Sequence, residues 1–296
     1  MNQEQADKIR TGNGFVAALD QSGGSTPKAL GLYGLDESAW SSDDEMFGLI
    51  HQMRARIVQS PSFTGDKIVG AILFEKTMDG DIGGKPTGDF LWEDKGVVPF
   101  LKVDKGLADE EDGVRLMKPM PELDDLLKKA VSKNIFGTKM RSVVDAASPT
   151  GIATNVAQQF EIGKRILGHG LIPIIEPEVT ISIADKAEAE DILRDEIANQ
   201  LDQLGDGVEV MLKLTLPEAA NHYKPLIDHK GVMKVVALSG GYNREEANAR
   251  LAQNAGMIAS FSRALSEGLS AQQSEAEFDA ALAASVSSIY NASVAG

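Results

Sequence analysis

The sequence of 296 residues contains no cysteine. This absence excludes a disulfide framework, a thiolate nucleophile and a zinc site built on cysteine ligands. Only four histidines are present, and they are scattered without the spacing of metal ligands. They are His51, His169, His222 and His229. We therefore expect neither a metal nor any other cofactor.

Positive charge is also scarce. The sequence has 29 lysines and arginines against 44 aspartates and glutamates, which gives a formal net charge of −15. Nucleic acids and anionic membranes are bound through basic surfaces, so neither is an expected partner. An anionic small molecule would have to be attracted by a local cluster of cations.

Long apolar runs are missing as well. No run approaches the roughly 18 residues needed to span a bilayer, and the N-terminal MNQEQADKIR is polar. The composition, 43% hydrophobic and 25% charged, is ordinary for a soluble globular protein. We expect a cytoplasmic protein, and the sequence does not indicate its oligomeric state.

The sequence does contain short apolar segments typical of strands, alternating with longer segments that carry helix signals. The expected strands are 15–20, 67–74, 97–104, 135–144, 171–179, 208–216, 232–239 and 257–263. The expected helices are 43–60, 122–133, 154–167, 184–204, 244–254 and a closing helix at 270–292.

Eight strands joined by helical crossovers predict a parallel sheet that closes into a (β/α)₈ TIM barrel. The length suits a barrel of about 250 residues with terminal helical additions, so we expect residues 1–296 to form a single catalytic domain. Segment 75–96 is rich in glycine and aspartate and predicts a long loop. A doubly wound open sheet is the alternative, but no G-x-G-x-x-G motif follows a strand.

One lysine, Lys213, stands within the apolar strand segment GVEVMLKLTLP. At the strand period of two it shares a face with Met211 and Thr215. On a surface strand, the commoner case, its ammonium group would simply lie in water. Inside a barrel the lysine loses hydration, and a fraction of it becomes the free amine that attacks carbonyls.

Other polar residues also gather at the C-terminal ends of the expected strands, which form the active-site face of a TIM barrel. They are Asp20, Lys102, Asp104, Lys139, Arg141, Glu176, Glu178, Ser239 and Arg263. Solvated strand ends would place charges at both ends instead. The cations, together with the glycine-rich turns QSGGST and LSGGY, predict phosphate binding. The carboxylates are either structural partners of the cations or the acid and base of a reaction.

The motifs around these residues resemble the class I (Schiff-base) fructose-1,6-bisphosphate aldolases in their shorter bacterial form. AALDQSGGS, LKVDKG, FGTKMR, PIIEPE, MLKLT, LSGGY and SFSRAL occur in the family's order between residues 17 and 265. The resemblance implies a cofactor-free lyase of glycolysis and gluconeogenesis. It would cleave fructose 1,6-bisphosphate reversibly to dihydroxyacetone phosphate and glyceraldehyde 3-phosphate.

The resemblance also implies catalytic roles. Lys213 is similar to the lysine that forms the imine, and Glu176 to the acid and base that serves dehydration of the carbinolamine. Asp20 resembles the acid near the hydroxyl that loses its proton during carbon–carbon cleavage. Lys139 resembles the neighbouring cation that disfavours a second positive charge on the imine-forming lysine. Glu178 is expected to pair with these lysines.

Two phosphate sites are implied in the same way. One comprises Ser239, Gly240, Gly241, Ser260 and Arg263, and the other Ser25, Lys28 and Lys102, with Arg141 in the same pocket.

The sequence departs from the animal enzymes at Gln21, where an acidic residue is common, and at Ala29, where a second basic residue is common. It ends in NASVAG without a tail bearing a terminal tyrosine, so the resemblance does not indicate which group protonates the enamine. Two other functions stay open: an imine-forming aldolase for a different phosphosugar, and a non-catalytic barrel that binds sugar phosphates.

Overall fold

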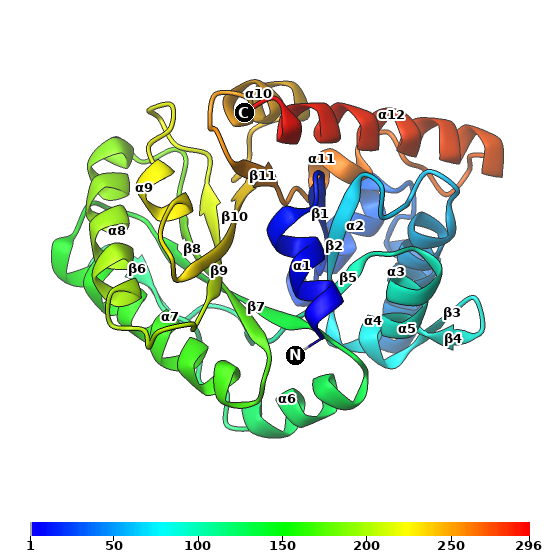
Figure 1. Cartoon of the computed structure of the whole chain (residues 1–296). Coiled ribbons are helices and arrows are strands. Elements are labelled where there is room, and N and C mark those ends of the chain that lie inside the picture. The colour runs from blue at the N-terminus through cyan, green and yellow to red at the C-terminus, as the bar shows by residue number, and fades with distance from the viewer. Residues whose placement is uncertain (1) are drawn as a thin grey trace.

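A computed structural model describes residues 2–296, and its centre is a barrel of eight parallel strands (Figure 1). In barrel order the strands are β1 (Phe15–Leu19), β2 (Ile68–Leu73), β5 (Val98–Lys102), β7 (Gly137–Val144), β8 (Ile172–Val179), β9 (Val210–Thr215), β10 (Val232–Leu238) and β11 (Met257–Ala259). The first and last strands meet where the Ala18 N–H donates to the Phe261 carbonyl at 3.4 Å. The predicted TIM barrel is therefore confirmed.

Helices connect the strands and cover the outside of the barrel (Figure 1). They are α1 (Gln3–Thr11), α2 (Thr26–Leu32), α3 (Asp43–Gln59), α4 (Glu75–Asp79), α5 (Thr87–Asp89), α6 (Leu123–Ser132), α7 (Pro149–Gly168), α8 (Lys186–Leu201), α9 (Lys224–Ile227), α10 (Arg244–Leu251), α11 (Arg263–Ser266) and α12 (Glu275–Val294). None of the helices within residues 2–296 is both long and apolar enough to cross a membrane.

All six predicted helices are present, but α7 begins earlier than its predicted start at residue 154. The Ser148 side chain caps it by accepting the Gly151 N–H at 3.1 Å. Pro149 fits the first helical position because a backbone N–H is not needed there. A serine and proline ahead of the apolar pattern thus add more than a turn to the helix.

Segment 75–96 is not the long loop that its composition predicts. It contains α4, α5, a π-helical turn at Phe90–Asp94 and a hairpin of β3 (Asp81–Ile82) and β4 (Lys85–Pro86). Gly83 and Gly84 both have positive φ, 61° and 79°, the conformation that a two-residue hairpin turn requires. The glycines therefore mark a tight turn inside a folded segment.

The last expected strand is also shorter than predicted, because β11 ends at Ala259. The Ser262 carbonyl accepts the N–H groups of Leu265 and Ser266, which turns the chain into α11. Arg263 consequently starts a short helix instead of ending a strand.

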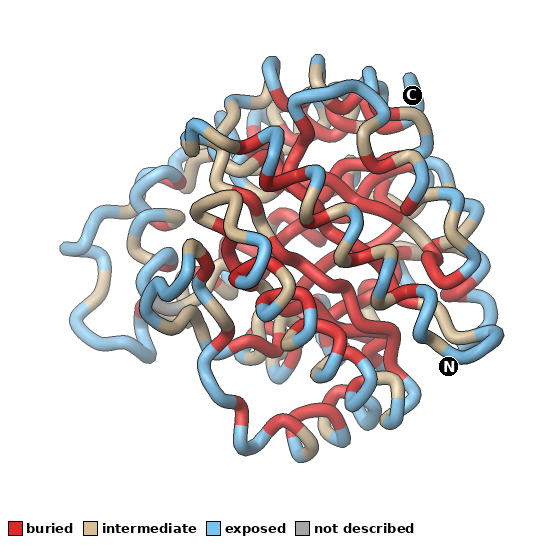
Figure 2. The backbone as a smooth tube through the Cα atoms, turned by 90° about the vertical axis from the view of Figure 1, so that its left-hand side faces the viewer, coloured by how far each residue is buried: buried red, intermediate tan, exposed pale blue. Residues whose placement is uncertain are grey.

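The interior of the barrel changes in polarity along its axis. At the N-terminal end of the barrel, Ala6 and Ile9 of α1 pack with inward residues of the strands, among them Val98, Ile172 and Met211. Helix α1 lies against β2, β5 and β10 and closes this end. Buried backbone fills the centre of the molecule, and exposed segments lie at its periphery (Figure 2). The interior of the barrel is thus filled at this end, and its polar side chains lie toward the other end.

Candidate active site

A cavity of about 590 Å³ opens at the C-terminal ends of the barrel strands. Its lining includes every predicted site residue except Gly241: Asp20, Ser25, Lys28, Lys102, Lys139, Arg141, Glu176, Glu178, Lys213, Ser239, Gly240, Ser260 and Arg263. Gly241 lies next to it, since a Cβ placed on this glycine would be 3.8 Å from Nη2 of Arg263. The structure therefore brings the predicted residues together, while their individual roles stay predictions.

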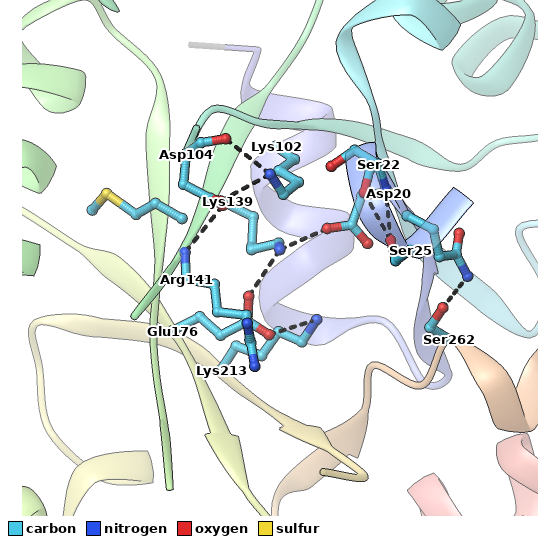
Figure 3. Close-up of polar contacts among 12 residues, drawn as sticks. Asp20, Ser22, Ser25, Lys102, Asp104, Lys139, Arg141, Glu176, Lys213 and Ser262 are labelled. Atoms are coloured by element: carbon cyan, nitrogen blue, oxygen red, sulfur yellow. Dashed lines mark hydrogen bonds and ion pairs between the residues drawn. The ribbon is translucent and has the colours of Figure 1, made fainter. Parts of the chain in front are cut away.

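Two lysines at the bottom of this cavity share one carboxylate (Figure 3). Lys213 Nζ lies 3.0 Å from Glu176 Oε1, and Lys139 Nζ lies 2.9 Å from Glu176 Oε2. Lys139 Nζ also lies 2.6 Å from Asp20 Oδ2. Glu176 and Lys139 are 3% exposed and Lys213 is 4% exposed, so these ion pairs are shielded from bulk water.

The charges of this cluster determine which groups stay ionised. Burial alone would raise the pKa of Asp20, but the charges of Lys139 and Lys213 outweigh it and hold that pKa well below its usual range. Burial alone would lower the pKa of Lys139, but Asp20 and Glu176 outweigh it and raise that pKa well above its usual range.

The two lysines are therefore not equivalent. Lys139 is held as a cation by two carboxylates, whereas Lys213 contacts only one within residues 2–296.

A second group of ion pairs lies nearer the cavity mouth. Lys102 Nζ is 2.8 Å from Asp104 Oδ1, and Asp104 Oδ2 accepts the backbone N–H of Arg141 at 3.2 Å. Nε of Arg141 donates to Glu178 at 2.5 Å. The prediction that Glu178 pairs with the lysines is therefore wrong. Its side chain points into the barrel one layer above Glu176, where the longer arginine side chain reaches it and the buried lysines do not.

Charge in the cavity is balanced except at its rim. The carboxylates of Asp20, Asp104, Glu176 and Glu178 match the cations of Lys102, Lys139, Arg141 and Lys213. Lys28 on α2 and Arg263 on α11 remain. Both are exposed, and neither makes an ion pair in the part of the chain that the structure describes. These two cations are available for an anionic ligand.

The turn after β10 offers further groups for an anion. Gly240 has φ of 61°, and a Cβ there would lie 2.8 Å from Cγ2 of Ile181, so only glycine fits. The hydroxyl of Ser260, a residue 2% exposed, has no hydrogen-bond partner among residues 2–296. A buried hydroxyl at the wall of a cavity is free to bond a ligand.

Sequence reasoning missed Arg54 of α3, which lies directly behind the start of the loop after β1. Its guanidinium donates to the Gln21 carbonyl and, at 2.8 Å, to Thr77 Oγ1. A signal was present, because Arg54 falls in helical phase with the buried residues Ile50 and Ile57. An arginine on the apolar face of a helix indicates a buried polar contact. Ser22, Ser262 and Leu32 also line the cavity and were missed.

The fold and this cavity define a class of protein: a parallel barrel enzyme with a buried lysine pair and carboxylates at the C-terminal ends of its strands. Within residues 2–296 no group of three or more histidines, aspartates or glutamates could hold a metal ion.

Comparison with known proteins specifies the family. No family model matches the chain. A class 1 fructose-bisphosphate aldolase of Synechocystis sp. is 57% identical, over 99% of this chain and 98% of the relative. A class 1 fructose-bisphosphate aldolase of Porphyromonas gingivalis is 58% identical, over 99% of this chain and 100% of the relative. The chain therefore belongs to the class 1 fructose-bisphosphate aldolases. This family confirms the resemblance and favours neither alternative function.

A solved structure of a fructose-bisphosphate aldolase from Plasmodium falciparum has the same fold. Its TM-score is 0.79 at 21% identity, and the match covers 99% of this chain and 94% of that one.

The depressed pKa of Asp20 predicts a pH-dependent contribution to stability. The pKa in the folded state lies below its ordinary value of 3.8. The ionised group therefore stabilises the fold above about pH 4, and this contribution is lost as the pH falls through the folded pKa. Asp20→Asn should lower the free energy of unfolding at pH 7 by on the order of 3 kcal/mol, because it leaves buried Lys139 with one carboxylate fewer.

Urea denaturation of both proteins at several pH values checks this prediction. The difference between wild type and Asp20→Asn should shrink steadily as the pH is lowered from about 5 to about 3. A difference that stays constant over this range would show that Asp20 is not held ionised by the lysines.

Proposed function

We propose that Lys213 is the nucleophile of the aldolase reaction and forms an imine with the C2 carbonyl of open-chain fructose 1,6-bisphosphate. The observation that carries this proposal is the sharing of Glu176 between Lys213 and Lys139. An amine attacks a carbonyl only after it loses its proton, and Glu176 is within 3.0 Å to accept that proton. Glu176 is uncharged once it holds this proton, and Lys139 keeps Asp20 as its anionic partner.

Glu176 then acts a second time. Attack of the amine gives a carbinolamine, whose hydroxyl group must leave as water. Glu176 returns its proton to this hydroxyl, water departs and a positively charged iminium remains on Lys213. The regenerated carboxylate lies beside that cation and stabilises it.

Asp20 accepts the proton of the C4 hydroxyl in the cleavage step. Lys139 holds Asp20 ionised, so it is ready to accept a proton at neutral pH. As this proton leaves, the C3–C4 bond breaks, its electron pair moves into the iminium, and glyceraldehyde 3-phosphate is released. The resulting enamine gains a proton at C3, and water hydrolyses the imine to release dihydroxyacetone phosphate and free Lys213.

The two phosphates are held at opposite sides of the cavity. Arg263, Ser260 and the Ser239–Gly241 turn bind the phosphate nearer the ketone. This assignment is supported by the Ser260 hydroxyl, which has no hydrogen-bond partner among the described residues 2–296. Lys28, Ser25 and Lys102 bind the other one. Two of the three donors of Lys102 Nζ are engaged by Asp104, at 2.8 Å each, which leaves one for a phosphate. Nη groups of Arg141 are further donors in the same cavity.

The domain organisation, cofactor independence and location that we propose for the enzyme agree with this substrate. Residues 1–296 act as one catalytic domain without a metal or cofactor. Phosphorylated sugars do not cross membranes unaided, so an enzyme that uses them works in the cytoplasm.

Replacement of Lys213 tests the proposal directly. Lys213→Met should lower the rate of fructose 1,6-bisphosphate cleavage by on the order of 10⁴-fold or more, because no nucleophile remains. Lys105→Met is the matched control, since Lys105 lies outside the cavity and pairs with Glu75 on the surface. A coupled assay for triose phosphate in the presence of excess EDTA measures both variants, and EDTA itself should have no effect. Cleavage by Lys213→Met, or a loss in EDTA that a divalent cation restores, would refute this mechanism.

The assignment of the two phosphate sites makes a separate prediction. Arg263→Ala should weaken binding of dihydroxyacetone phosphate by about 1.5–3 kcal/mol, the range for a hydrogen bond to a charged group. It should weaken binding of glyceraldehyde 3-phosphate much less. Lys28→Ala should show the opposite preference. Calorimetric titration of both variants with both triose phosphates decides the matter, and equal losses for the two ligands would mean that the sites are assigned wrongly.

A further inference from the structure

The side chain of Gln21 joins two loops on different sides of the cavity. Gln21 follows Asp20 in the loop that leads from β1 to Lys28 on α2. Its amide Nε2 donates to Oγ of Ser262, the residue that precedes Arg263 (dashed line to Ser262 in Figure 3). Both side chains line the cavity. The loop carrying one rim cation is therefore tied to the loop carrying the other.

The main chain of Gln21 is fixed from behind by Arg54. This arginine is 1% exposed, and its Nη2 donates to the Gln21 carbonyl while Nη1 donates to Thr77 Oγ1. Burial lowers the pKa of Arg54 to about 10, and the charge of Asp20 offsets part of this effect. Arg54 makes no ion pair within residues 2–296. Its charge interacts with that of Asp20 without direct contact, and its two Nη groups hold a backbone carbonyl and a hydroxyl group.

The hydrogen bond between Gln21 and Ser262 affects how tightly the cavity can bind a ligand that carries two phosphates. A ligand held at both ends binds best when the two sites are already spaced to match it, because no free energy is then spent on ordering the loops. The turn next to Gln21 has exposed residues, including Gly24 and Ser25. Without a contact across the cavity mouth, the distance between this loop and the loop that carries Arg263 would have to be set by the ligand itself.

We propose that Arg54, Gln21 and Ser262 form a strut that sets the distance between the two phosphate-binding ends of the cavity. Gln21 and Ser262 are then positioning residues that favour a bisphosphate over a monophosphate. Arg54 anchors the strut to α3 and α4. The inference rests on the proposed function for the identity of the two phosphate sites.

A double-mutant cycle tests the strut. The variants are Gln21→Ala, Ser262→Ala and their combination, with Ser262→Thr as the conservative change that keeps the hydroxyl. Gln253→Ala, an exposed glutamine on the turn after α10, is the matched control. The probes are hexitol 1,6-bisphosphate, which carries both phosphates but no carbonyl, and dihydroxyacetone phosphate, which carries one. Calorimetry measures their affinities, and assays measure kcat and KM.

Each alanine variant should weaken binding of hexitol 1,6-bisphosphate roughly tenfold, and the double variant should lose no more than either single one, because both remove the same interaction. Affinity for dihydroxyacetone phosphate should change by less than about twofold, because one phosphate does not sense the spacing. KM for the bisphosphate should rise with little change in kcat. Ser262→Thr and Gln253→Ala should behave like wild type.

Equal losses for the two probes would show a general effect on the fold and overturn the strut, as would losses that simply add in the double variant. Hexitol 1,6-bisphosphate binds without forming an imine, so the two proposals fail separately. If the strut variants show the predicted selectivity while Lys213 proves unreactive, the proposed function fails and the strut stands. If wild type does not bind this probe at all, the assignment of the two phosphate sites and the strut that joins them are both wrong.

Discussion

The carboxylate of Glu176 lies between the ammonium groups of two buried lysines, and the chemistry of the cavity depends on this arrangement. The register of three adjacent strands produces it. Ile174 is aligned with Lys139 on β7 and with Met211 on β9. Glu176 and Lys213 each lie two residues beyond that layer, so both point into the barrel. A shift of one residue in either pairing would turn a side chain outwards and separate the acid from the amine.

The layers of the barrel make such a polar cluster tolerable. Below it the interior is apolar and α1 closes the end, so water reaches the cluster only from the mouth. Burying a charge is costly unless it is paired, and each of the four carboxylates has a cationic partner. The same balance leaves Lys28 and Arg263 at the rim, where neither forms an ion pair with the residues that the structure describes. A protein with net charge −15 thereby presents local positive charge to a phosphorylated substrate.

The barrel and most of the cavity lining could be predicted from the sequence because both follow from local periodicity. The period of two in GVEVMLKLTLP places Lys213 on one face, and the order of strands and helices brings the strand ends together. Contacts made by long side chains could not be predicted. Glu178 pairs with Arg141, and Arg54 reaches the loop after β1 from a neighbouring helix. Both depend on distances across the folded molecule. The glycine content of segment 75–96 predicts a loop incorrectly, because glycine occurs in tight turns as well as in open loops.

The most direct test of this account identifies which lysine becomes covalently attached to substrate. Borohydride reduces an imine to a stable secondary amine, so treatment of the enzyme with dihydroxyacetone phosphate and borohydride should inactivate it. Peptide mass spectrometry should then locate the mass of the reduced substrate on the peptide containing Lys213, with Lys139 unmodified. Attachment to Lys139, or inactivation without attachment to Lys213, would contradict the division of roles between the two lysines that share Glu176.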